Sequence, residues 1–258
     1  MQRSQSLSLK LILTAVNAAV YAAIGALWTV FPVLFFGVRF WPQVFAPAVF
    51  SVLFGPWVGG VGAAIGIFIA DVLYGHHDAL LSLLVGVPSN LVGFFIIGWL
   101  TNHDFKSLTR RVLVVVSLAI QPVYAVALVY GLFLLTGSQS NSSYVEVAIP
   151  GLVAAVAIVG LFLVRNKWAG FEVAASIGLA IGTAIIGVGI VVYSAIFGLP
   201  VAVGLGTKPL GSVFMYVVTA SSYFTEIPFM VVLTPPIAAA CRAAFPGLRG
   251  MSQRQATN

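Results

Sequence analysis

The most unusual chemical group in this sequence is a carboxylate placed inside an apolar stretch. Glu226 lies near the middle of the apolar segment 211–241, two residues before Pro228. An ionisable side chain in such surroundings is costly, so it is a candidate functional group. The proline leaves a backbone carbonyl unpaired and opens the helix locally. Glu226 therefore either serves a binding or proton site, or is held by neighbouring Ser and Tyr hydroxyls for structural reasons alone.

Three further polar residues lie in or beside apolar segments. Asp71 falls in the last turn of the segment 57–74, as a binding group or as an acid at the membrane interface. Asn90 follows Pro88, and an amide beside such a kink either lines a ligand cavity or satisfies its neighbours. Arg39 belongs to the loop before the next helix. We expect Arg39, Asp71, Asn90 and Glu226 to contribute to substrate binding.

The motifs of common enzymes and cofactor sites are missing from the sequence. "GLGTKPL" lacks the Ser or Thr that follows the lysine of a P-loop, and neither G-x-S-x-G nor H-E-x-x-H occurs. The His76-His77-Asp78 turn could bind a metal, but adjacent residues rarely present ligands to one ion, and a short wet turn explains them equally. We therefore expect no enzyme activity, no cofactor and no metal.

Composition places the chain in a membrane. Of its 258 residues 60% are hydrophobic and only 7% are charged, whereas a soluble domain carries about 25% charged residues. The apolar segments are 9–31, 44–55, 57–74, 79–100, 112–136, 147–164, 171–197 and 211–241. Lipid offers no partner for open backbone groups, so each is read as a helix. The predicted fold is an all-α polytopic membrane bundle of about eight helices, forming a single domain over residues 1–258.

The positions of the basic residues predict the orientation. If Gly55-Pro56 is a tight turn between two crossings, ten of the twelve Lys and Arg residues fall on the side of the N-terminus, and only Arg39 and Lys208 fall opposite. If 44–74 is a single crossing, the basic residues are divided between the two sides of the membrane and the bias is lost. Positive charge marks the cytoplasmic side. We therefore expect a plasma-membrane protein with cytoplasmic tails at 1–8 and 247–258. The segment 44–55 is short for a crossing, so it must gain length from 40–43 or be covered by its neighbours.

Small residues are spaced for close contact between helices. Glycine pairs four residues apart occur at 55/59, 62/66 and 178/182, and ordinary bundle packing is the simplest reading of them. In the first helix, alanines recur at three- and four-residue spacing and are expected to share one side. They are Ala15, Ala18, Ala19, Ala22 and Ala26.

Several of these stretches resemble one family of membrane proteins. "AVNAAVYAAIGALW" is similar to the alanine-rich first helix of the S components of energy-coupling factor (ECF) transporters, which capture vitamins and other micronutrients. "FWPQVFAPAVFSVLFGPWVGGVGAAIGIFIADVL" resembles the loop, short second helix, G-P-x-x-G turn and third helix of that family. "GVPSNLVGFFIIGWL" and "IPFMVVLTPPIAAACRAAFP" resemble later helices. The likeness covers 9–100 and 211–246, and the family has six helices where eight are counted here.

The resemblance implies a function and partners. An S component binds its substrate on the outer side and docks on a T component driven by two cytoplasmic ATPases, which fits the missing P-loop. The docking face would be the first helix, in the register Ala18/Ala22 or Ala19/Ala23. A stand-alone secondary transporter with Glu226 or Asp71 as a proton site is the competing reading, although no inverted repeat is evident. A purely structural membrane protein is a third reading, but it would not need Glu226 in the middle of a membrane.

Overall fold

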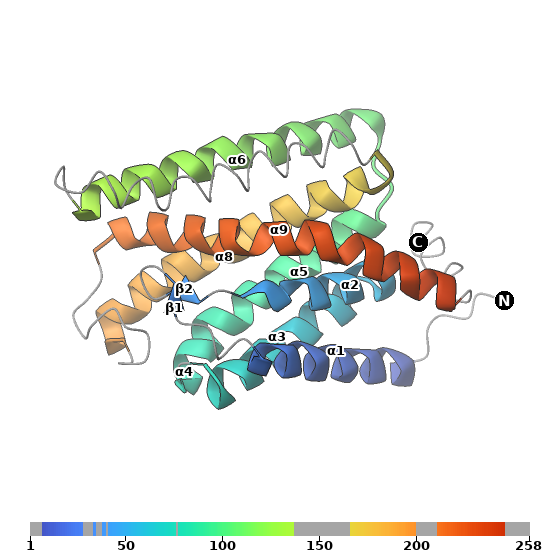
Figure 1. Ribbon diagram of the computed structural model, residues 1–258, viewed down its shortest axis with the longest axis horizontal. Helices are drawn as coiled ribbons and strands as arrows, with labels where there is room; N and C mark the ends of the chain where they lie inside the picture. The colour runs from blue at the N-terminus through green and yellow to red at the C-terminus, as the bar shows by residue number, and fades with distance from the viewer. Residues whose placement is uncertain are drawn as a thin grey trace.

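The computed structural model describes residues 7–27, 33–34, 38–39, 41–75, 77–136, 166–199 and 211–245. Within these ranges the molecule is an elongated bundle of helices (Figure 1). Six helical segments are long and apolar enough to cross a membrane. They are α1 (Leu7–Leu27), α3 (Pro56–Leu73), the run from α4 (Ala79–Leu81) to α5 (Val87–Asn102), α6 (Ser107–Thr136), α8 (Ala169–Phe197) and α9 (Val213–Ala244).

The predicted all-α membrane bundle is confirmed at this level, whereas the count of eight is not. Six predicted segments correspond to the six long helical segments. The predicted segment 147–164 lies outside the described residues. α6 ends at one end of the bundle and α8 begins at the other (Figure 1). α1 begins at Leu7, and most of the predicted tail 1–8 lies outside the described residues.

The short predicted segment 44–55 is a short helix inside the bundle. α2 (Phe45–Phe54) extends a 3₁₀ turn, η2 (Pro42–Val44), and most of its side chains are buried. Together they reach about 20 Å, less than the roughly 30 Å of a hydrocarbon core. As expected, this segment both gains length at its start and is covered by its neighbours. The chain then reverses at Gly55, whose φ of 92° suits glycine, and Pro56 starts α3.

The helix after the next turn contains a local irregularity. Asp78 caps α4 by accepting hydrogen bonds from the backbone N–H groups of Leu80 and Leu81, both at 3.0 Å. A π-helical stretch, η3 (Ser82–Gly86), then leads into α5. Pro88 lacks the N–H that a regular helix would use, and wider π turns occur at such interruptions and frequently at functional sites. This irregular stretch shapes the start of α5, where Asn90 is located.

Glycines bring three pairs of helices into close contact. On α3, a Cβ at Gly62 would lie 2.7 Å from the Asn17 Cβ of α1, and one at Gly66 would lie 2.9 Å from the Ala18 carbonyl oxygen. On α8, a Cβ at Gly178 would lie 2.6 Å from the Gly93 carbonyl oxygen of α5. Gly59 packs on Ser51 in the same way. The packing interpretation of the glycine pairs is therefore confirmed.

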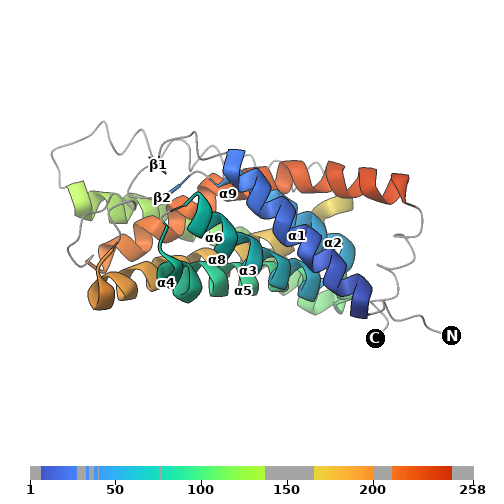
Figure 2. The same cartoon turned by 90° about the horizontal axis from the view of Figure 1, so that it is seen from below.

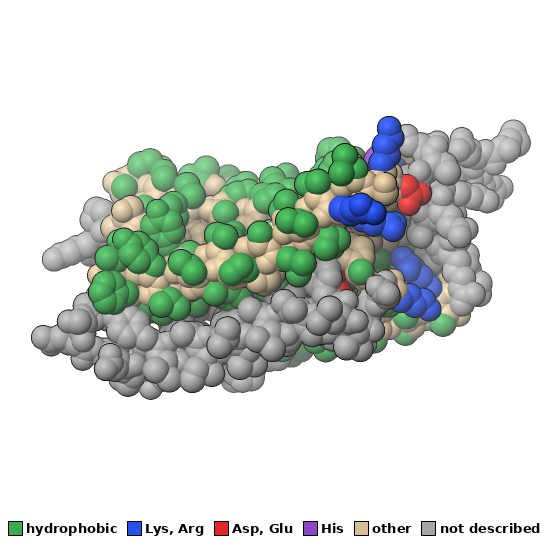
Figure 3. All heavy atoms as spheres, turned by 90° about the horizontal axis from the view of Figure 1, so that it is seen from above, with side chains coloured by type: hydrophobic (Ala, Val, Ile, Leu, Met, Phe, Trp, Pro, Cys, Tyr) green, Lys and Arg blue, Asp and Glu red, His purple; other side chains and the backbone are tan. Residues whose placement is uncertain are grey.

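Charge and apolar surface are separated along the bundle. The starts of α1, α6 and α8 and the end of α9 lie at the same end (Figure 1), and these are the places where the described lysines and most described arginines occur. On the face seen in Figure 3, Lys and Arg side chains gather at one end, whereas the rest of the described surface is largely hydrophobic. We call this end, defined by Lys10, Lys106, Arg110, Arg111, Lys167 and Arg242, the basic end. Exposed aliphatic side chains along the helices suit contact with lipid.

Candidate functional site

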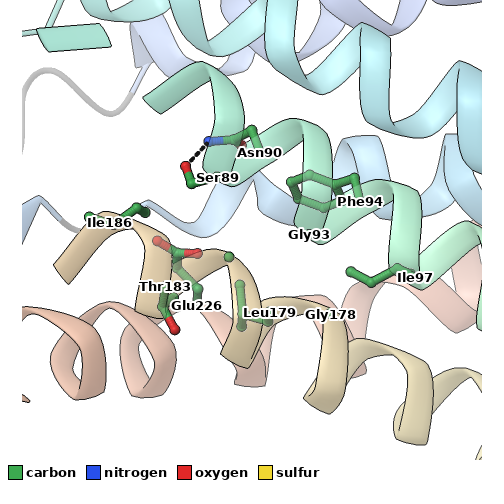
Figure 4. Close-up of a pocket in the computed structure, with 11 residues that line it drawn as sticks. Ser89, Asn90, Gly93, Phe94, Ile97, Gly178, Leu179, Thr183, Ile186 and Glu226 are labelled. Atoms are coloured by element: carbon green, nitrogen blue, oxygen red, sulfur yellow. Dashed lines mark hydrogen bonds between the residues drawn. The ribbon is translucent and has the colours of Figure 1, made fainter. Parts of the chain in front are cut away.

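A small cavity lies between α5, α8 and α9. Its volume is about 20 Å³, and Ser89, Asn90, Thr183 and Glu226 supply its polar lining. Figure 4 shows the Glu226 carboxylate beside α8, on the side that faces the Ser89–Asn90 turn of α5. A space of this size holds about one water molecule. Two of the four residues predicted to bind substrate, Asn90 and Glu226, therefore meet here although 136 positions separate them (226 − 90).

The Glu226 carboxylate has an unusual environment. Only 8% of the residue is exposed, and it lies in α9 two positions before Pro228. Among the described residues it has neither a hydrogen bond nor an ion pair. The hydroxyl of the adjacent Thr225 is used within α9, where it donates to the Ser221 carbonyl oxygen at 2.8 Å. The structural alternative, a carboxylate held by nearby Ser and Tyr hydroxyls, finds no such bond here.

A chain of hydrogen bonds reaches the cavity from α1 and η2. The Trp41 indole N–H donates to the Tyr21 hydroxyl at 3.1 Å, and that hydroxyl donates to the Asn90 Oδ1 at 3.0 Å. The Asn90 amide N–H donates in turn to the Gly86 carbonyl oxygen at 2.9 Å. Tyr21 is almost fully buried. Three segments that are distant in sequence, at Tyr21, Trp41 and 86–90, are thus joined around Asn90, and the orientation of its amide is fixed.

Asp71 contacts the π-helical stretch from α3. Its Oδ2 accepts a hydrogen bond of 2.7 Å from the Ser82 hydroxyl, in the π-helical stretch. A Cβ on Gly86 would approach the same carboxylate oxygen to 2.9 Å, so Asp71 packs against the backbone that also serves Asn90. Asp71 does not line the cavity. It supports the irregular start of α5 and stays a predicted binding residue.

The remaining loop residues are partly outside the described region. The backbone of Arg39 pairs with Val33 in the ribbon formed by β1 (Val33–Leu34) and β2 (Val38–Arg39), and β2 contacts α9. The side chain of Arg39, like all of His76, lies outside the described residues. His77 contacts the Val72 carbonyl oxygen through Nδ1 at 2.9 Å, and Asp78 accepts from the Tyr193 hydroxyl at 2.9 Å. Within the described ranges no three His, Cys, Asp or Glu residues are grouped to hold a metal.

The alanines of the first helix fall on two sides of α1. Ala18 and Ala22 are only 4% and 5% exposed and face the bundle. Ala19 and Ala23 are exposed, and so is Ala15. α1 lies against α3 and α2 at the edge of the bundle (Figures 1 and 2), so its outer side has no described neighbour. The expectation that all the alanines share one side is therefore wrong, and only the Ala19/Ala23 register is open on the surface.

The sequence did not single out Tyr21, Trp41, Ser89 or Thr183 as members of this cluster. A signal for Tyr21 was present. Asn17 and Tyr21 are spaced four residues apart on an otherwise apolar helix, and polar groups on such a helix turn towards the protein. The position of Thr183 relative to Glu226 could not be read from the sequence, because it depends on how α8 packs against α9.

Six apolar helices with a polar cluster buried among them define the chain as a membrane protein of the helical-bundle class. No protein-family model, no curated protein and no solved structure matches the chain.

Proposed function

We propose that this protein is the substrate-capturing subunit of an ECF-type transporter for a vitamin or another small micronutrient. The observation that carries the proposal is the meeting of Asn90 and Glu226 at a cavity, with Tyr21 hydrogen-bonded to the asparagine and Trp41 hydrogen-bonded to Tyr21. Convergence of polar groups from separate helices is one feature of small-molecule sites, and the helices around this small cavity would have to separate to admit a vitamin. The buried short helix α2 and the alanine-rich α1 also agree with the resemblance noted in the sequence.

The orientation of the site fits capture from outside. Asn90 lies at the start of α5, and the other end of that helix is at the basic end. If the basic end is cytoplasmic, as positive charge indicates, Asn90 lies in the outer half of the bundle. Both termini would then be cytoplasmic.

The partners in this proposal are a T component and two cytoplasmic ATPases encoded as separate chains. The docking surface would be the outer side of α1 in the register Ala15, Ala19 and Ala23, which we call the outer alanine stripe. These small side chains are exposed at four-residue spacing and would let a partner helix approach closely.

Binding and uptake test the proposal together. A panel of labelled vitamins and precursors is offered to cells that produce the protein with and without a T component and its ATPases. We expect uptake of one compound only when the ATPases are present, and loss of its binding to purified protein carrying Glu226→Gln or Asn90→Ala. Thr225→Val, one position from Glu226 but outside the cavity lining, is the matched control and should bind normally. Unchanged affinity in both site variants would remove these residues from the site.

A stand-alone secondary transporter is the second candidate. It is favoured by the buried Glu226 carboxylate, because ionisable residues within membrane helices mark proton relays. Uptake into vesicles that contain only this chain, driven by an imposed proton gradient and stopped by a protonophore, would support this function instead.

A further inference from the structure

Half of the six cations that define the basic end lie at the start of α6. Lys106, Arg110 and Arg111 fall within six residues, and all three side chains are exposed. Asp104 lies two positions before Lys106, but no ion pair joins these cations to any acid in the described part of the chain. Orientation in the membrane calls for positive charge at this end, but not for its concentration at the start of one helix.

These charges lie where the helix itself disfavours them. The free N–H groups at the start of a helix give that end a partial positive charge, so acids stabilise it and cations do not. The first turn of α6 contains no acid. The three cations therefore repel both the helix dipole and one another, and an anion bound from outside the protein would relieve both repulsions.

Aromatic rings place this turn at the level of the lipid headgroups. Trp99, near the end of α5, is 47% exposed, and its ring centroid lies 5.5 Å from that of His103 and 5.7 Å from that of Phe105. Tryptophan at the end of an apolar helix is typical of the interface between membrane and water. Lys106 follows Phe105 directly, so α6 starts in the same layer.

Apolar side chains continue from the cations into the membrane on the same side of α6. Val115 and Leu118 follow Arg111 by four and seven residues, so the three side chains share one side of the helix. Val115 is 64% exposed and Leu118 is 40% exposed. A cation above an aliphatic stripe fits a molecule with an anionic head and a hydrocarbon tail, whereas a soluble anion would use only the cation.

We infer that the start of α6 binds an anionic phospholipid, with the phosphate held by Arg110 and Arg111. An acyl chain of this lipid lies along Val115 and Leu118. Arginine suits the headgroup because its guanidinium group forms paired hydrogen bonds to phosphate oxygens. Lys106, whose carbonyl oxygen accepts from the Arg110 N–H one turn later at 3.0 Å, adds a further positive charge. The inference goes beyond the proposed function, since a lipid here binds without substrate, T component or ATPases.

The test uses purified full-length protein in micelles of a neutral detergent, without any substrate. Thermal unfolding is followed while dioleoyl phosphatidylglycerol, dioleoyl phosphatidylcholine or glycerol phosphate is added in separate series. A ligand that binds only the folded state raises the midpoint of unfolding. Each Lys or Arg near a membrane surface changes the affinity for anionic lipid by about fivefold. We expect phosphatidylglycerol to give the same rise as phosphatidylcholine at a concentration lower by about tenfold or more, and glycerol phosphate to give no rise.

Variants assign the effect to the start of α6. Arg110→Gln with Arg111→Gln should raise the required concentration of phosphatidylglycerol by about tenfold or more. Lys10→Gln is the control and should respond like the original protein, because it removes a cation from the same end on α1, on the opposite side of the bundle from α6 (Figures 1 and 2). If the double variant does not fold, Arg111→Gln alone decides, with a response weaker by about fivefold. Equal responses to the two lipids, an unchanged response in the arginine variants, an equal loss in Lys10→Gln, or a rise with glycerol phosphate would overturn the inference.

Discussion

The two sides of α1 use the same amino acid for different purposes. The inner side carries Ala18 and Ala22 beside Asn17, Tyr21 and Gly25, and all of these are buried. The outer alanine stripe is exposed, as are the neighbouring Val16 and Val20. Alanine on the inner side lets α3 approach, whereas alanine on the outer side leaves a smooth surface. The difference shows that small size alone does not distinguish internal packing from a free docking surface.

The contacts of the inner side explain why it needs small residues. Gly62 and Gly66 of α3 leave no room for a Cβ against Asn17 and Ala18. The Asn17 amide donates to the carbonyl oxygens of Val58 and Gly59 at 2.9 and 3.2 Å, which fixes the rotation of α1 about its axis. Lipid is as apolar as leucine, so such packing and hydrogen bonds must hold the pair together.

The largest expected effect is the double substitution Ala18→Leu with Ala22→Leu. Each leucine adds several atoms to a contact that is already close-packed, and overpacking costs about 1–3 kcal/mol per site. We expect the free energy of unfolding to fall by about 3 kcal/mol or more, measured by denaturant titration of purified protein in micelles. A stable, fully folded double variant would show that α1 is not packed on α3 as described.

A smaller effect is expected from Gly62→Ala. The new Cβ would lie 2.7 Å from the Asn17 Cβ, so the helices must separate, at about 1–3 kcal/mol. Gly170→Ala on α8 is the matched control, because a Cβ there has no neighbour within 4 Å and should change the stability little. Equal stabilities of the two variants would contradict the close contact between α1 and α3.

Asn17→Ala should cost less again. It removes two side-chain hydrogen bonds, but their acceptors are helix carbonyl oxygens, so no group that depends on Asn17 alone is stranded. Hydrogen bonds between membrane helices are worth about 0.6 kcal/mol on average, so we expect a loss of about 1 kcal/mol in the same titration. Because the asparagine side chain also blocks a Cβ at Gly62, Gly62→Ala should cost less in this background. Strict additivity of the two changes would show that they do not touch.

The sequence predicted the bundle well and the two sides of α1 poorly, for a physical reason. Length and hydropathy located the six long helical segments, and Gly55-Pro56 located the turn. In a helix of a soluble protein, the apolar side is the side that faces the core. A helix in lipid is apolar all round, so the difference in hydropathy between its two sides is missing. Only Asn17, Tyr21 and Gly25 mark the inner side of α1.

Only part of the candidate site could be predicted from the sequence. Asn90 and Glu226 were found because a polar group beside a proline on an apolar segment is costly without a purpose. Gln121 has the same pattern before Pro122, yet its amide donates to the Ser176 and Tyr223 hydroxyls at 3.3 and 2.6 Å and lines no part of this cavity. Whether such a polar group lines the cavity or bonds elsewhere depends on its neighbours on other helices, which the sequence does not specify.

The smallest effect on stability should come from Ala19→Leu with Ala23→Leu, and this pair separates docking from packing most directly. Both side chains are exposed on the outer side of α1, so leucine there meets lipid instead of another helix, and the free energy of unfolding should change by less than about 0.5 kcal/mol. In the proposed transporter the same two leucines would keep a partner helix from approaching closely. We therefore expect normal substrate binding by the purified variant but loss of ATP-driven uptake and of co-purification with the T component. Full uptake by this variant would exclude the outer alanine stripe as the docking surface, and a large loss of stability would show that this side of α1 is covered within the protein itself.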